Sequence, residues 1–159
     1  MLREYRDEDA ARLNQVALAA FRQFHEAYDD WPAMAASIGR MSVLSQTSEI
    51  IVAEDHGEIV GGVAYVPAGA AKAAYFDPHW PIIRMLVVDP QARGRGLGRL
   101  LTEECIARAR RDRSPVIALH TTPVMSIALR MYLRMGFERF RDALSIYGVP
   151  YGVYILRLA

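Results

Sequence analysis

The chain has 159 residues, of which 52% are hydrophobic and 23% are charged, and its formal net charge at pH 7 is +1. A chain of this length buries enough apolar surface to fold without disulfides, and its composition is that of a soluble globular protein. The near-neutral charge argues against attraction of the whole surface to nucleic acid or to a membrane. We therefore expect one domain over residues 1–159.

The N-terminal sequence MLREYRDEDA carries charges where a signal peptide has an apolar core, and no run of about 18 apolar residues follows. The single cysteine, Cys105, has no partner for an internal disulfide and lies in a helical pattern that suits a small buried side chain. These features predict a cytoplasmic protein without a membrane anchor.

Hydrophobic periodicity predicts the elements in chain order. Asp7 is a candidate N-cap for the first helix and Asp30 for the second, where Pro32 falls in the first turn. The expected elements are a strand over 2–5, helices over 7–24 and from 30, strands flanking a turn at 55–57, a loop over 68–81, a strand over 82–88, a helix ending near 111, a strand over 114–122, a helix over 125–135, and strands over about 138–147 and 151–158. The order β-α-α-β-β-β-α-β-α-β-β predicts an α/β fold with a mixed sheet.

The segment VVDPQARGRGLGRLL places Gly94, Gly96 and Gly98 between a strand and a helix. A helix N-terminus has unpaired N–H groups and partial positive charge, and glycines let the backbone approach an anion closely. Residues 84–113 contain eight arginines and four acids. We predict a pyrophosphate site; the alternative is a tight turn with a solvated arginine face.

Two familiar phosphate motifs do not fit this segment. A Walker loop needs lysine followed by serine or threonine after its last glycine, and a dinucleotide fingerprint needs glycine where this chain has Arg99.

The same segment resembles the acyl-coenzyme A signature of the GNAT (GCN5-related N-acetyltransferase) superfamily, with Arg93, Gly96 and Gly98 at its fixed positions. A second segment, ALRMYLRMGF, resembles that family's next signature, in which a helix carries tyrosine, three residues and glycine-phenylalanine. The element order also matches the family's fold, in which the central sheet is splayed.

The resemblance implies an N-acetyltransferase that moves the acetyl group of acetyl-CoA to a primary amine by direct attack in a ternary complex, without a metal. By analogy with the family, Tyr132 protonates the leaving thiolate; read from its helix alone, it is a core aromatic. The implied cofactor-binding residues are Leu86, Val87, Val88, Arg93, Gly94, Arg95, Gly96, Leu97, Gly98 and Arg99.

The chain departs from the family pattern at two positions. Met125 occupies a position where many relatives have asparagine, and Ser126 beside it is a candidate replacement. Arg84 occupies the strand where many have a glutamate general base. His120, at the end of the next strand, is a candidate base or equally a structural histidine; His79 and a relaying water are alternatives.

The acceptor is a small-molecule or peptide amine that the sequence does not identify. Aromatic residues in the helical hairpin and final strands suit a flat or apolar amine, or form core or a homodimer surface instead: Phe24, Tyr28, Trp31, Tyr147 and Tyr151. The rival functions are a catalytically silent acyl-CoA sensor, an acyltransferase for longer chains, and nucleic-acid binding by the arginine face, which neither the net charge nor an aromatic signature favours.

Overall fold

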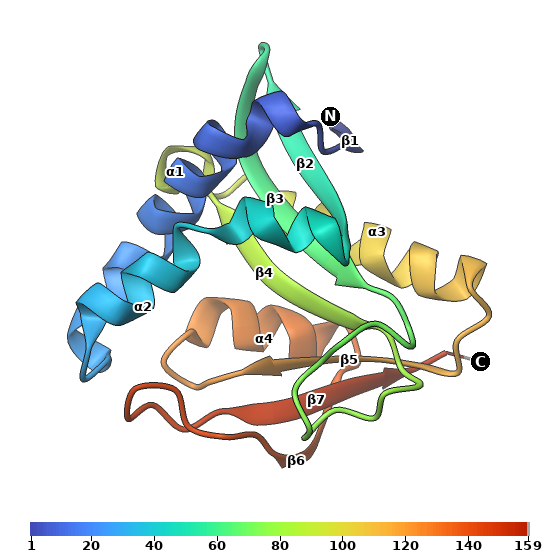
Figure 1. Cartoon of the computed structure of the whole chain (residues 1–159). Helices are drawn as coiled ribbons and strands as arrows, with labels where there is room; N and C mark the ends of the chain where they lie inside the picture. The colour runs from blue at the N-terminus through green and yellow to red at the C-terminus, as the bar shows by residue number, and fades with distance from the viewer. Residues whose placement is uncertain (159) are drawn as a thin grey trace.

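Seven strands form one mixed sheet in the order β1-β2-β3-β4-β5-β7-β6 (Figure 1). The computed structural model describes residues 1–158. Within these residues only the pair β4–β5 is parallel, and every other neighbouring pair is antiparallel. The strands are β1 (Leu2–Glu4), β2 (Glu49–Asp55), β3 (Glu58–Val66), β4 (Ile82–Val88), β5 (Val116–Thr121), β6 (Glu138–Asp142) and β7 (Gly152–Arg157).

Four α-helices cover the two faces of this sheet. The helices are α1 (Ala10–Phe21), α2 (Trp31–Ile38), α3 (Leu97–Arg111) and α4 (Ser126–Arg134). Side chains of α1 and α2 pack on one face, and those of α3 and α4 pack on the other. We call these the α1/α2 face and the α3/α4 face. No helix within residues 1–158 is both long enough and apolar enough to span a bilayer. The element order agrees with the sequence prediction.

Local sequence explains several element ends. The Asp30 carboxylate accepts a hydrogen bond from the N–H of Ala33 at 3.1 Å and so caps α2, as predicted. His56 and Gly57 both have positive φ in the turn between β2 and β3, which closes the expected hairpin. The prediction that Asp7 caps the first helix is wrong, because Asp7 opens a 3₁₀ turn (Asp7–Asp9) and α1 begins at Ala10.

Two other predicted boundaries also differ. The first helix ends at Phe21, and Phe24 belongs to a separate 3₁₀ helix over Arg22–Ala27. The strand expected over 138–147 ends at Asp142, although an isolated bridge between Ile146 and Val149 continues the hairpin. β6 is exposed along its length at the sheet edge, so few buried side chains define where it ends.

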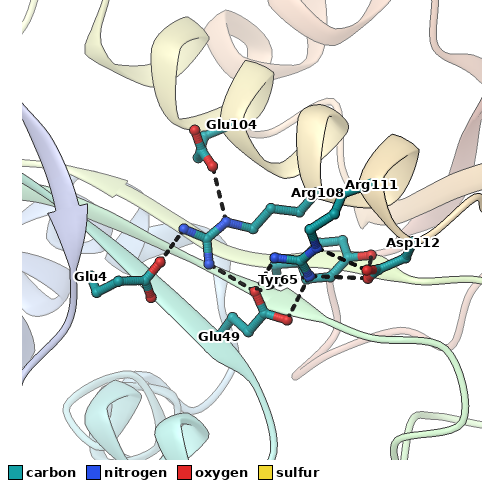
Figure 2. A network of polar contacts seen from close by, with 7 residues as sticks. All are labelled: Glu4, Glu49, Tyr65, Glu104, Arg108, Arg111 and Asp112. Carbon is teal, nitrogen blue, oxygen red and sulfur yellow. Dashed lines mark hydrogen bonds and ion pairs between the residues drawn. The ribbon is translucent and has the colours of Figure 1, made fainter.

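A network of charged groups fixes the C-terminal end of α3 to the first strands (Figure 2). The Arg108 guanidinium is 11% exposed and donates to Glu104 at 3.0 Å, to Glu49 at 2.8 Å and to Glu4. Arg111 pairs with Glu49 as well. These contacts join α3 to β1 and to the residue that opens β2.

The parallel strands β4 and β5 separate after a single paired position, Ile82 with Ala118. On its other edge β4 is paired with β3 up to Val88, with an irregularity near Met85. Met85 has φ of +57°, a left-handed conformation that is rare for a non-glycine residue and marks a bulge here. The sheet is therefore splayed beyond Ile82, as the resemblance to the GNAT superfamily implied, and the β4 edge that faces β5 is open there.

Candidate active site

A cleft of about 620 Å³ lies at the splay, between the glycine loop, β4, α4 and the end of α1. Its lining is largely apolar, which suits a long flexible ligand with few polar groups along its length. The lining residues are Ala20, Phe21, Gln23, Phe24, Leu86, Val88, Ala92, Arg93, Gly94, Gly96, Leu97, Gly98, Arg99, Met125, Ser126, Ile127, Ala128, Met131, Arg134 and Met135.

The glycine loop shapes one wall of the cleft. Gly94 and Gly96 have φ of +79° and +75°, a conformation that side chains strongly disfavour. Gly96 is the N-cap of α3, and its carbonyl accepts the N–H of Leu100 at 3.1 Å. The N–H groups of the first turn of α3 consequently have no intrahelical acceptors, which is the arrangement that binds anions.

Gly98 plays a different part. A Cβ built there would meet the Met131 sulfur at 3.7 Å and the Leu86 Cδ2 at 3.9 Å. Both neighbours line the cleft, so the absent side chain leaves room between α3, β4 and α4.

The positive charges around the cleft are not equally neutralised. Arg95 donates to Asp55 at 2.7 Å, and Arg99 donates to Glu103 at 2.7 Å. Arg93 and Arg134 make no ion pair with any carboxylate within residues 1–158. These two guanidiniums are available to an anionic ligand.

The structure brings together eight of the ten predicted cofactor-binding residues along this cleft. The side chains of the other two point away from it. The Val87 side chain is buried on the α1/α2 face, and Arg95 is held toward Asp55. Alternation along β4 explains Val87, since neighbouring residues of a strand point to opposite faces.

Several lining residues were not predicted from the sequence. Phe21 and Gln23 come from the end of α1 and the following 3₁₀ helix, and only the tertiary fold carries them across β4. At the end of α4, Met131 is followed at spacings of three and four by Arg134 and Met135. This pattern was not recognised as a cleft wall, because the helix was interpreted as part of the core.

Tyr132 is buried on the α3/α4 face. Its ring packs edge-on against Phe137 at 5.6 Å between centroids, and it shares a core cluster with Cys105. Burial raises the pKa of the Tyr132 phenol, which keeps the hydroxyl protonated. No hydrogen-bond partner of that hydroxyl occurs among residues 1–158, and Ala128 and Met131 on the same helix line the cleft.

His120 lies on the opposite face of the sheet. Its Nδ1 is 2.8 Å from the Tyr75 hydroxyl, and its ring stacks on Tyr75 and packs on Tyr151, with centroid distances of 5.7 and 5.1 Å. Burial, and secondarily the charge of Arg84, lower the pKa of His120 to about 4. The imidazole is therefore neutral at neutral pH.

The other histidines have exposed side chains and make their contacts away from His120. His79 bonds Asp77 within its own loop, and its side chain is 89% exposed.

Met125 and Ser126 both line the cleft at the start of α4. Within residues 1–158 no three histidine, cysteine or acidic side chains gather to hold a metal ion.

The aromatics expected at an acceptor groove divide into two groups. Phe24 lines the cleft itself. Tyr28 and Tyr151 are buried on the α1/α2 face, where their hydroxyls hydrogen-bond each other, and Trp31 packs near Tyr28 at 6.4 Å. Tyr147 is 41% exposed beyond them.

Comparison with known proteins gives consistent relatives. The model of the Acetyltransferase (GNAT) family matches residues 10–137. A mycothiol acetyltransferase of Acidothermus cellulolyticus is 35% identical over 96 residues, which are 56% of this chain and 29% of that protein. N-alpha-acetyltransferase 30 of Saccharomyces cerevisiae is 32% identical over 91 residues, 54% of this chain and 51% of that protein. The matched parts thus cover 29% of one relative and 51% of the other.

Solved structures agree on the fold. A GNAT family acetyltransferase of Staphylococcus aureus Mu50 superposes with a TM-score of 0.76 at 16% identity, over 100% of this chain and 99% of that one. A GNAT family acetyltransferase of Brucella melitensis, solved in complex with acetyl-CoA, superposes with a TM-score of 0.67 at 25% identity, over 100% and 88%. Together with the match over residues 10–137, the splayed sheet and the glycine loop establish that this chain belongs to the GNAT acetyltransferase family.

Proposed function

We propose that the protein transfers the acetyl group of acetyl-CoA to a primary amine by direct attack in a ternary complex. The observation that carries this proposal is the cleft, where a glycine loop at a helix N-terminus and two arginines without carboxylate partners lie beside the open edge of β4. Family membership and the acetyl-CoA bound to the Brucella melitensis relative support the same ligand.

The cleft fits the parts of acetyl-CoA in sequence. The free N–H groups at the start of α3 bind the pyrophosphate, and Arg93 and Arg134 neutralise phosphate charge. The apolar side chains of Leu86, Met131 and their neighbours contact the pantetheine arm. The open edge of β4 beyond Ile82 offers backbone groups to the arm and to the thioester oxygen.

In the transfer, the amine nitrogen bonds to the thioester carbonyl carbon, the carbon–sulfur bond breaks, and the nitrogen loses a proton while sulfur gains one. Holding amine and thioester together in the splay supplies the proximity that this step needs. Backbone N–H groups of β4 stabilise the oxygen as it gains negative charge.

Tyr132 is the proposed proton donor to the leaving thiolate. Its hydroxyl is protonated, has no competing partner among residues 1–158 and belongs to a helix that borders the cleft. Tyr132→Phe keeps the packed ring and removes only that hydroxyl. We expect the maximal rate to fall roughly 10- to 100-fold with coenzyme A affinity unchanged. Rates equal within a factor of about two would make Tyr132 a packing residue.

His120 is the proposed base that accepts the amine proton, directly or through water. Because its pKa is about 4, it stays unprotonated above pH 5 and can accept the proton of a bound ammonium there, so the wild-type rate should persist at neutral pH. His120→Gln should lower the rate most near neutral pH, where neutral amine is scarce. An unchanged pH–rate profile in that variant would reduce His120 to a structural role.

Gly98→Val tests the cofactor assignment itself. Gly98 has no positive φ, and its Cβ would meet only ordinary contacts, so the variant should fold. The valine methyls would project between Met131 and Leu86, and coenzyme A affinity in calorimetry should fall tenfold or more, a loss of about 1.4 kcal/mol. Ala107→Val, on the exposed side of α3, is the matched control and should bind normally. Equal affinity of both variants would refute the cleft as the cofactor site.

A silent acyl-CoA sensor is the second candidate, favoured by Met125 and Arg84 at positions where many relatives carry asparagine and glutamate. Thiol release from acetyl-CoA with a panel of amines separates the two functions. Binding of acetyl-CoA with no release above hydrolysis would favour the sensor. Faster release from a longer acyl-CoA would replace the acetyl group in our proposal.

A further inference from the structure

Arg84 and His120 occupy equivalent positions on the two strands that separate. Ile82 of β4 pairs with Ala118 of β5, and Arg84 and His120 each lie two residues further along these parallel strands. Both point to the α1/α2 face, since Arg84 pairs with Ala64 of that face and His120 follows the alternation of β5. The two side chains therefore flank the splay on the α1/α2 face.

Arg84 carries a charge that the protein does not neutralise. Its guanidinium is exposed and forms no ion pair with a carboxylate of residues 1–158, while its charge is close enough to add to the effect of burial in lowering the pKa of His120. This contrasts with Arg108, whose guanidinium has three carboxylate partners. A guanidinium without a carboxylate beside a binding cavity is suited to receive one from a ligand.

A hollow of about 390 Å³ adjoins Arg84 between α2, the following 3₁₀ helix (Met41–Gln46) and β4. Arg40, Arg84 and Ser37 provide its polar side chains, and none of its lining residues is acidic. Arg40 likewise has no ion pair among the described residues. The remaining lining is mainly apolar, with Met41 and Met85 among it.

An aromatic wall lies on the other side of the splay. The rings of Tyr75, Phe76 and Tyr151 surround His120 with centroid distances of 5.1–5.7 Å. No acidic side chain belongs to this wall, so an acceptor held by its cationic nitrogen alone finds no carboxylate in either the wall or the hollow.

We propose that the acceptor is an amine that also carries a carboxylate, and that Arg84 binds this carboxylate with Arg40 as an additional cation. The inference rests on the proposed acetyl transfer and names its substrate class. The carboxylate anchors the acceptor on the α1/α2 face, and its amine points into the splay beside His120. Acceptors that carry only positive charge, such as polyamines, are poor substrates because two guanidiniums repel them.

Pairs of amines that differ only in the carboxylate test the proposal. Phenylalanine, leucine, methionine and alanine are compared with phenylalaninol, leucinol, methioninol and alaninol, in which a hydroxymethyl group replaces the carboxylate. Thiol release from saturating acetyl-CoA gives kcat/KM, expressed per concentration of neutral amine. We expect the best acceptor to carry the carboxylate and to exceed its alcohol roughly 10- to 100-fold, the size of one charge-assisted hydrogen bond.

Variants of Arg84 assign the preference to this residue. Arg84→Gln should lower kcat/KM for the carboxylate acceptor and leave that for the alcohol nearly unchanged, so that the ratio falls toward one. Arg84→Lys should recover part of the preference for the carboxylate. Arg110→Gln, which removes an exposed, unpaired arginine from the outer part of α3, should keep the wild-type ratio.

Each outcome separates this inference from the acetyltransferase assignment. If the alcohols react as well as the acids, or if the preference survives in Arg84→Gln, the proposal of a carboxylate-bearing acceptor is wrong. Acetyl transfer itself then still stands. Bound acetyl-CoA with no turnover of any amine in the panel overturns both.

Discussion

The two ends of α3 carry arginines that look alike in the sequence and differ in the fold. At the C-terminal end, Arg108 and Arg111 are bound to carboxylates from β1, β2 and α3 (Figure 2). Before the N-terminal end, Arg93 lies at the cleft with no carboxylate partner among residues 1–158. One end holds the protein together, and the other remains able to bind a ligand.

The difference comes from where the acids are. Glu4 and Glu49, which neutralise the C-terminal end, are far from α3 in the chain and reach it only when β1 and β2 pair in the sheet. A count of charges along residues 84–113 cannot separate the two groups of arginines. Substitutions at each end can separate them, because those at the C-terminal end should lower stability and those at the N-terminal end should lower coenzyme A affinity.

Arg108→Met should give the largest effect. It leaves Glu4 and Glu104 without their cationic partner and Glu49 with Arg111 alone around a nearly buried position, and we expect the free energy of unfolding to fall by about 3 kcal/mol. Urea denaturation measures this, with Arg110→Met as the exposed control expected within about 0.5 kcal/mol of wild type. Coenzyme A affinity of folded Arg108→Met should be unchanged, and a loss of affinity without a loss of stability would reverse our assignment of the two ends.

Arg93→Gln should show the opposite pattern. One charge-assisted contact to phosphate is lost, so coenzyme A affinity should decrease about tenfold, and the salt dependence of binding should weaken. Calorimetry at two salt concentrations measures both quantities. Stability should be maintained, since Arg93 has no ion pair with the described residues 1–158; a destabilised variant with normal affinity would contradict the comparison.

Tyr65→Phe probes the network from the sheet. The Tyr65 ring is fully buried and its hydroxyl donates to Asp112 at 2.8 Å, so removal of that hydroxyl should cost about 1 kcal/mol of stability. The same substitution at Tyr147, which is exposed and whose hydroxyl makes no recorded bond to residues 1–158, should cost little. Equal melting curves for the two variants would show that the network does not stabilise α3.

Acidification should produce the smallest effect. Hydrogen bonding from Arg111 is the main reason that the pKa of Asp112 is lowered below its ordinary value near 3.9. A carboxylate whose pKa is lower in the folded state adds stability above its unfolded pKa and loses it as the pH falls through the folded pKa. The contribution should therefore disappear below about pH 4, and Asp112→Asn should show a flatter decline there in thermal unfolding. Parallel pH curves for both proteins would assign acid sensitivity to other groups, such as Asp9.

Local sequence predicted most of the secondary structure for reasons that are visible in the structure. The β2–β3 hairpin follows from a turn with two positive φ values, and α2 begins where Asp30 and Pro32 favour a helix start. The predicted start of the first helix was wrong because Asp7–Asp9 form a 3₁₀ turn and α1 begins only at Ala10. β6 was overextended because an exposed edge strand lacks buried positions that fix its end.

The sequence alone determined the part of the site that a single continuous segment forms. The glycine loop, the start of α3 and the last residues of β4 are neighbours in the chain, so their backbone conformations and spacing specify the proposed anion-binding wall directly. The tertiary structure decided everything that depends on distant segments. It carried Phe21 and Arg134 into the cleft, placed Tyr132 and His120 on opposite faces, and chose which arginines are neutralised. The physical reason is that burial and charge pairing depend on which elements meet, whereas turn and cap geometry depend on a few adjacent residues.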